Sequence, residues 1–215
     1  MKVNIAKSNY MVFSRAKDAF TTRLQVNEEN LERIHFTNKS IWIQEDLSWS
    51  RNCQEICRKA YSRLSLITKL RYVGVSRDDL IDIYVLFIRS VAEYCSVIFH
   101  SSLTQEQNLK LERIQKTCLK VILGKEYSDY QTALEICGLE SLEQRRKNRC
   151  LDFSLKCLRH SKNHRLFPSN SKVTDHDLRS NEPFKVNFAR TSSYQNSTIP
   201  YCQRLLNQHY MKINI

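Results

Sequence analysis

Cysteine and histidine are the first residues of this sequence that could do chemistry, because both bind metal ions. The chain has eight cysteines and six histidines, and Cys150 and Cys157 lie two helical turns apart. No Cys-x-x-Cys pair occurs, and His160 with His164 has no cysteine partners at zinc-finger spacing. Cysteines at apolar helical positions pack as small hydrophobes. The sequence therefore predicts no metal site, no cofactor and no disulfide framework.

Asp78 and Asp79 are adjacent carboxylates, the type of pair that holds two magnesium ions in polymerases. A catalytic pair must lie on a tight hairpin beside a third carboxylate, whereas this pair follows Ser76 at the start of a helical pattern. Helix capping and the helix dipole explain the two aspartates better. A phosphate-binding glycine loop and a Gly-x-Ser-x-Gly elbow are also absent from the sequence. We therefore expect this chain alone not to be an enzyme.

Basic residues are the remaining candidates for a function. The formal net charge of +12 indicates an acidic partner, most simply nucleic acid or an anionic surface. The basic residues cluster in two helical patterns, where they could follow a phosphate backbone and release its counterions. The candidate contacts are Arg58, Lys59, Arg63, Arg145, Arg146, Lys147 and Arg149. The alternative is that these are solvated helix faces that keep the protein soluble.

The elements that must position these residues are expected to be mainly α-helices. Glycine and proline number only three each, which leaves little turn material for an all-β fold. Two consecutive helical patterns between residues 76 and 124 form the expected centre. Ser76 and Thr104 begin them, with Asp79 and Gln107 three residues on as capping-box partners. Further helices are predicted over residues 50–72, 128–137 and 142–160.

The sequence divides into three predicted regions. Residues 1–46 hold a small β remnant, with short strands over Tyr10–Ser14 and around the turn at Thr37-Asn38-Lys39. Residues 47–165 form a helical domain. Residues 166–215 are expected to be an irregular connector, because serine, asparagine and proline recur there.

The location of the protein is predicted from segments that the sequence lacks. Residues 1–20 contain no apolar run long enough for a cleavable signal peptide. Asp82, Arg89 and Glu93 interrupt the most apolar helix, so it does not offer the ~20 apolar residues of a membrane span. We therefore expect an intracellular protein, cytoplasmic or nuclear, that is neither secreted nor bound to a membrane.

A series of short motifs runs in order along nearly the whole chain. They are Met11-Val12-Phe13-Ser14, Asp46-Leu47-Ser48-Trp49, Phe87-Ile88-Arg89-Ser90, Leu111-Glu112-Arg113-Ile114-Gln115-Lys116 and Arg204-Leu205-Leu206-Asn207. This series resembles the part of non-LTR (LINE-type) retrotransposon reverse transcriptases that follows the catalytic hairpin. One departure is Thr37-Asn38-Lys39-Ser40, where the family usually has Tyr-Leu-Gly-Val.

The resemblance implies the end of a palm, a thumb-like helical bundle and a C-terminal connector. A thumb binds the template–primer, an RNA–DNA hybrid or RNA, by its backbone and without sequence preference. The family is an RNA-directed DNA polymerase, but its catalytic aspartates lie upstream of the matching segment, so the resemblance implies a non-catalytic fragment that binds nucleic acid weakly.

Two alternatives stay open at this point. The chain could be a helical protein-interaction module or a retroelement remnant without a function. Residues 47–75 also resemble a short N-terminal region of AlkB-type tRNA dioxygenase and methyltransferase proteins. The iron-binding His-x-Asp motif and a glycine-rich loop for S-adenosylmethionine are absent from the sequence, so this likeness implies none of the catalytic domains.

Overall fold

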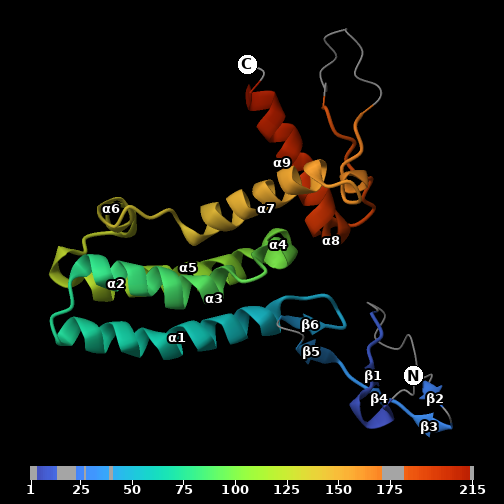
Figure 1. The fold of residues 1–215 in the computed structure, drawn as a ribbon, viewed down its shortest axis with the longest axis horizontal. Coiled ribbons are helices and arrows are strands. Elements are labelled where there is room, and N and C mark those ends of the chain that lie inside the picture. Colours follow the sequence, from blue (N-terminus) through green and yellow to red (C-terminus); the bar gives the residue numbers. More distant parts are fainter. Residues whose placement is uncertain (1–3, 14–22, 27, 39–40, 171–181, 214–215) are drawn as a thin grey trace. The chain divides into compact units, whose positions relative to one another are not determined.

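The protein is mainly helical, with short strands near its N-terminus (Figure 1), which confirms the predicted fold class. The structure is a computed structural model that describes residues 4–13, 23–26, 28–38, 41–170 and 182–213. The chain forms two compact units, Met1–Glu55 and Ile56–Ile215. The division falls inside the long helix α1 (Ser50–Tyr72), whereas the sequence suggested a division after residue 46.

The first unit contains three two-stranded sheets. The strands are β1 (Asn9–Tyr10) parallel to β4 (Glu32–Arg33), β2 (Gln25–Val26) antiparallel to β3 (Glu29–Asn30), and β5 (Phe36–Asn38) antiparallel to β6 (Trp42–Gln44). The β5–β6 pair confirms two strands in this region, but Thr37 and Asn38, which were predicted in the turn, belong to β5, and Lys39 lies outside the described residues. The predicted strand Tyr10–Ser14 is shorter than expected, because pairing ends at Tyr10, and Ser14 lies outside the described residues.

The second unit is built from helices of very different lengths. In order they are the rest of α1, α2 (Arg77–Ile83), the π-helix η2 (Tyr84–Arg89), α3 (Ser90–Glu93), α4 (Ser96–Phe99), η3 (His100–Ser102), α5 (Gln105–Leu123), η4 (Gly124–Glu126), α6 (Tyr130–Ile136), α7 (Leu142–Arg159), η5 (His164–Leu166), α8 (Ser192–Gln195) and α9 (Thr198–Ile213). In Figure 1, α5 runs between α1 and α7. The predicted helix ranges for α1 and α7 are confirmed to within one residue.

The predicted helix starts are also confirmed. Ser76 Oγ accepts a hydrogen bond from the backbone N–H of Asp79 at 3.2 Å. Thr104 and Gln107 form a complete capping box, in which each side chain bonds the other residue's backbone N–H. These bonds satisfy N–H groups that have no partner inside the helix.

The helix after Ser76 is not continuous, in contrast to the prediction. A π-helical turn occupies Tyr84–Arg89, and Cys95 then adopts the left-handed conformation, with φ of 52°. The chain restarts as α4, which packs on α7 and buries Phe99. This segment is apolar on nearly all faces of a helix. Its pattern is therefore compatible with burial whether the helix continues straight or the chain changes direction, so it cannot reveal the break.

The prediction of an irregular C-terminal connector is wrong for Thr198–Ile213, which form the helix α9. Cys202, Leu205 and Leu206 of α9 are buried against Cys150 and Cys157 of α7. Proline lies at residue 200, in the first helical turn, where its missing N–H removes no helical hydrogen bond. Burial of each leucine contributes roughly 2 kcal/mol, so this segment is part of the core of the second unit.

Candidate nucleic-acid interface

The seven predicted contact residues do not form one surface. Arg58, Lys59 and Arg63 are exposed on α1, and Arg63 donates a hydrogen bond to the backbone carbonyl of Phe87 on η2. The other four predicted residues belong to α7, and α5 runs between α1 and α7 (Figure 1). The two predicted basic rows are therefore separate surfaces.

Arg146 is not available to a phosphate group, and its prediction as a contact is wrong. Its relative exposure is 0%, and its Nη2 atom donates to Asn108 Oδ1 of α5 at 3.0 Å. The residue lies four positions from both Leu142 and Cys150, so it shares their buried face of the helix. Arg146 thus ties α7 to α5 within the second unit.

Lys147 is exposed but points away from its basic neighbours on α7. It is two residues from both Arg145 and Arg149, which corresponds to about 200° around a helix. Arg145 and Arg149, four residues apart, lie on the same flank. The predicted group of four cations is therefore reduced to this pair.

Arg145 and Arg149 share one buried carboxylate. Glu93 at the end of α3 has a side chain only 3% exposed. Its Oε2 atom lies 2.9 Å from Arg149 Nη2 and 3.3 Å from Arg145 Nη2, and its Oε1 atom accepts from Arg145 Nε. Arg89, one helical turn before Glu93, approaches the same carboxylate at 3.9 Å. Three helical segments thus meet at one ion cluster.

This cluster has an excess of positive charge. Three guanidinium groups against one carboxylate leave two positive charges unbalanced. The hydrogen bond to Glu93 raises the pKa of Arg145, whereas burial, followed by repulsion from Arg145, lowers the pKa of Arg89. The Arg149 side chain is 49% exposed, so its guanidinium is held by Glu93 and still reaches solvent. The cluster is therefore fixed in place and attractive to a second anion.

A cleft of about 550 Å³ lies beside the cluster. Its lining includes Arg145, Asn148, Arg149, Asp152, Phe153 and Lys156, which are spaced along one face of α7, together with Val97 of α4 and Glu140. Lys156 extends the row of Arg145 and Arg149, because it lies seven residues beyond Arg149. We refer to Arg145, Arg149 and Lys156 as the α7 row.

The sequence prediction did not include Glu93, Asn148 or Lys156. Spacing from Arg145 places Asn148 and Lys156 on its side of the helix, a signal that was present in the sequence. Glu93 had no such signal, because its two partners on α7, Arg145 and Arg149, are more than 50 residues away in the chain.

Buried polar groups of α5 hold the start of α7. Glu112 accepts hydrogen bonds from the backbone N–H groups of Leu142 and Glu143, both at 3.1 Å. A carboxylate at a helix N-terminus satisfies free N–H groups and interacts favourably with the helix dipole. Gln115 of α5 donates to the backbone carbonyl of Glu140 at 2.9 Å. The beginning of α7 is therefore fixed to α5.

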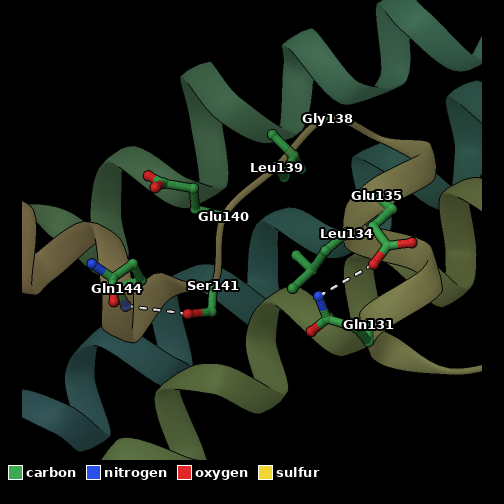
Figure 2. A pocket seen from close by; sticks show the side chains of 8 residues that line it. All are labelled: Gln131, Leu134, Glu135, Gly138, Leu139, Glu140, Ser141 and Gln144. Atoms are coloured by element: carbon green, nitrogen blue, oxygen red, sulfur yellow. Dashed lines mark hydrogen bonds between the residues drawn. The ribbon is translucent and has the colours of Figure 1, made fainter.

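A second pocket lies between α6 and α7 (Figure 2). Gln131 donates to Glu135 at 3.5 Å on one side of it, and Ser141 caps α7 on the other. Its lining includes the carboxylates of Glu135 and Glu140 and, among the described residues, no cation. This pocket does not suit a phosphate group.

The described residues offer no site of two other classes. They contain no group of three or more histidine, cysteine, aspartate or glutamate side chains arranged to hold a metal ion. No helix in the described ranges is long and apolar enough to cross a membrane.

Comparison of the chain with protein-family models, with curated proteins and with solved structures finds no match. The fold and the site together define a mainly helical protein with a cleft lined by arginines that a buried glutamate holds in place. A function for this cleft has to be argued from its chemistry.

Proposed function

We propose that the protein is a non-catalytic, reverse transcriptase-like fragment that binds the phosphate backbone of an RNA–DNA hybrid or RNA through the α7 row. One observation carries this proposal: Glu93 holds two arginines of α7 at the edge of a cleft, with an excess of positive charge. The ordered motifs that resemble the end of a LINE-type reverse transcriptase support it, because a thumb binds its duplex by the backbone.

Guanidinium groups suit this task because their planar fork of N–H donors matches the oxygen atoms of a phosphate. Arg149 uses Nη2 for Glu93, and about half of its side chain remains exposed. Lys156 is also exposed and adds a flexible point charge. Contacts of this type carry no base information, so the binding is expected to be independent of sequence.

The exposed residues Arg58, Lys59 and Arg63 form a second basic surface on α1. Between Ile56 and Tyr72 this helix contains no acidic residue. The side chains of this surface line no described cavity together with the α7 row. In the proposal, they therefore attract the phosphates at long range and make no defined contact with them.

The test is binding of a fluorescent RNA–DNA hybrid, followed by anisotropy at several salt concentrations. A plot of log affinity against log salt should be linear, and the variant R149A/K156A should lower its slope by roughly 0.9–1.8, about 0.9 for each phosphate that the two side chains neutralise. The variant K125A/K147A removes two exposed lysines outside the row and is the matched control. Equal changes of slope in both variants, or no binding by folded wild-type protein, would contradict the proposal.

A second candidate function is a protein-interaction module, which exposed apolar side chains favour. Leu86, Phe87 and Tyr94 are 67%, 52% and 53% exposed. Apolar association persists or strengthens as salt rises, because it involves no counterion release. Sedimentation or pull-down measurements in which complexes survive high salt and are absent with Leu86→Ser would favour this function over the first.

A further inference from the structure

The cleft beside α7 offers apolar surface as well as positive charge. Phe153 of α7 and Val97 of α4 both line it. Both also pack against the buried core of α7 and α9, which holds them in place. Asn148 contributes an amide, whose oxygen accepts from Gln144 at 2.8 Å and whose nitrogen donates to Glu140 at 3.4 Å, so that one N–H and one lone pair remain for a ligand. The cavity therefore presents an aromatic ring, an amide and cations to one ligand.

The charge of the lining fits a single phosphate. Arg89, Arg145, Arg149 and Lys156 supply four positive charges, and the buried Glu93 supplies one negative charge. The lining carboxylates of Glu140 and Asp152 supply two more negative charges, which leaves one positive charge. A longer run of phosphates would meet these two carboxylates. A surface that followed many phosphates would have no need for acidic groups in its cavity.

The ring of Phe153 has no base to contact in a paired duplex. A duplex presents its phosphates and keeps its bases stacked inside, whereas an unpaired base can stack on an aromatic side chain. The cleft volume of about 550 Å³ lies within the range of small-ligand sites, ~300–1,000 Å³.

We propose that this cleft binds one unpaired nucleotide of a single-stranded segment. Arg149 and Lys156 hold its phosphate, and its base lies against Phe153 with its edge toward Asn148. This inference rests on the proposed function. It adds that the part of the nucleic acid bound at α7 is the end of a strand or an unpaired stretch of it.

The test compares adenosine 5′-monophosphate with inorganic phosphate by calorimetric titration of the full chain. The nucleotide is expected to bind at least tenfold more tightly than phosphate. Phe153→Leu should weaken nucleotide binding by about fivefold or more, the effect expected for removing one base–aromatic stack, and leave phosphate binding unchanged. Phe87→Leu changes an exposed phenylalanine outside the cleft and should change neither affinity. Circular dichroism melting shows whether each variant is folded.

Saturation-transfer NMR of the nucleotide on the wild-type protein gives an answer that requires no variant. Strong transfer to the adenine protons supports the inference, and transfer to the ribose alone overturns it. Equal affinities for nucleotide and phosphate, or hybrid binding without any nucleotide binding, overturn this inference and leave the proposed function intact. Nucleotide binding without hybrid binding would overturn the proposed function instead.

Discussion

Tyr84 of the π-helix donates a hydrogen bond from its hydroxyl to Gln115 Oε1 of α5 at 2.7 Å, and both side chains are fully buried. Burial raises the pKa of Tyr84 well above its ordinary value, so the hydroxyl stays protonated and can donate. Because Gln115 also bonds the backbone carbonyl of Glu140 before α7, the pair connects three separate parts of the second unit.

The variant Tyr84→Phe removes this donor and leaves the Gln115 oxygen buried. We expect the free energy of unfolding to fall by about 1–2 kcal/mol, the cost of a buried acceptor without its partner. Urea unfolding measures the change. Tyr94→Phe, at an exposed tyrosine, is the control and should have no measurable effect. A similar fall in both variants would show that the hydrogen bond is not the cause.

Replacement of Glu93 by glutamine should destabilise the fold strongly. The change keeps the shape of the side chain but leaves Arg89, Arg145 and Arg149 without their shared carboxylate. We expect the free energy of unfolding to fall by roughly 2–4 kcal/mol, because a buried cation loses its counter-charge while the exposed part of Arg149 remains solvated. Glu106→Gln breaks an exposed pair with Lys110 and serves as the control, with little change expected. Comparable urea midpoints for the two variants would exclude a structural role for the cluster.

Gly124 and Gly138 provide a test of backbone strain. Both have positive φ, 57° and 60°, where alanine is strained by roughly 1–2 kcal/mol, and Gly124 also has ψ of −112°, a combination that only glycine adopts readily. A Cβ at Gly124 would also meet the guanidinium of Arg71, which donates to the Val121 carbonyl, whereas a Cβ at Gly138 has open space. Gly124→Ala should therefore lower the melting temperature more than Gly138→Ala. A melting temperature of Gly124→Ala equal to or above that of Gly138→Ala would contradict this expectation.

His100 should make stability depend on pH. It is buried, and burial, followed by repulsion from Arg146 and Lys147, lowers its pKa from 6.5 to about 4. Between these two pH values the unfolded chain binds a proton that the native protein does not, so stability falls as pH drops from 6.5 to 4. The full decrease amounts to roughly 3 kcal/mol, the free-energy equivalent of this pKa shift.

The measurement for His100 is a comparison with His100→Gln, because carboxylates also titrate in acid. Urea unfolding of both proteins between pH 7 and pH 4 gives the difference in stability at each pH. We expect the free energy of unfolding of the variant to rise relative to that of the wild-type protein as pH falls. A difference that stays constant over this range would mean that the pKa of His100 is the same in the native and the unfolded protein.

The sequence was sufficient to predict the long helices because their signals are local. Thr104 with Gln107 marks the start of α5, and an apolar stripe runs the length of α1. The break at Cys95 could not be predicted, since a left-handed residue other than glycine depends on the packing around it. Pro200 was interpreted as a sign of irregular structure, although a proline in the first turn is compatible with a helix.

The candidate site was predicted less completely, for a related reason. Counting positive charges along α7 could not show that Arg146 is buried, although its four-residue spacing from Leu142 and Cys150 indicated an inward position. The role of Glu93 depends on contacts with residues more than 50 positions away, which only the tertiary structure brings together.

The two glutamates that hold α7 also restrict how its length can change. Glu112 bonds the backbone at residues 142 and 143, and Glu93 pairs with side chains at 145 and 149. One inserted or deleted residue between these contacts would turn the rest of the helix by about 100°. The arginines would then leave Glu93, and the buried side of α7 would face water. Insertions and deletions between residues 142 and 149 should therefore prevent stable folding. The same changes after the helix ends, at residues 160–163, should leave the protein folded.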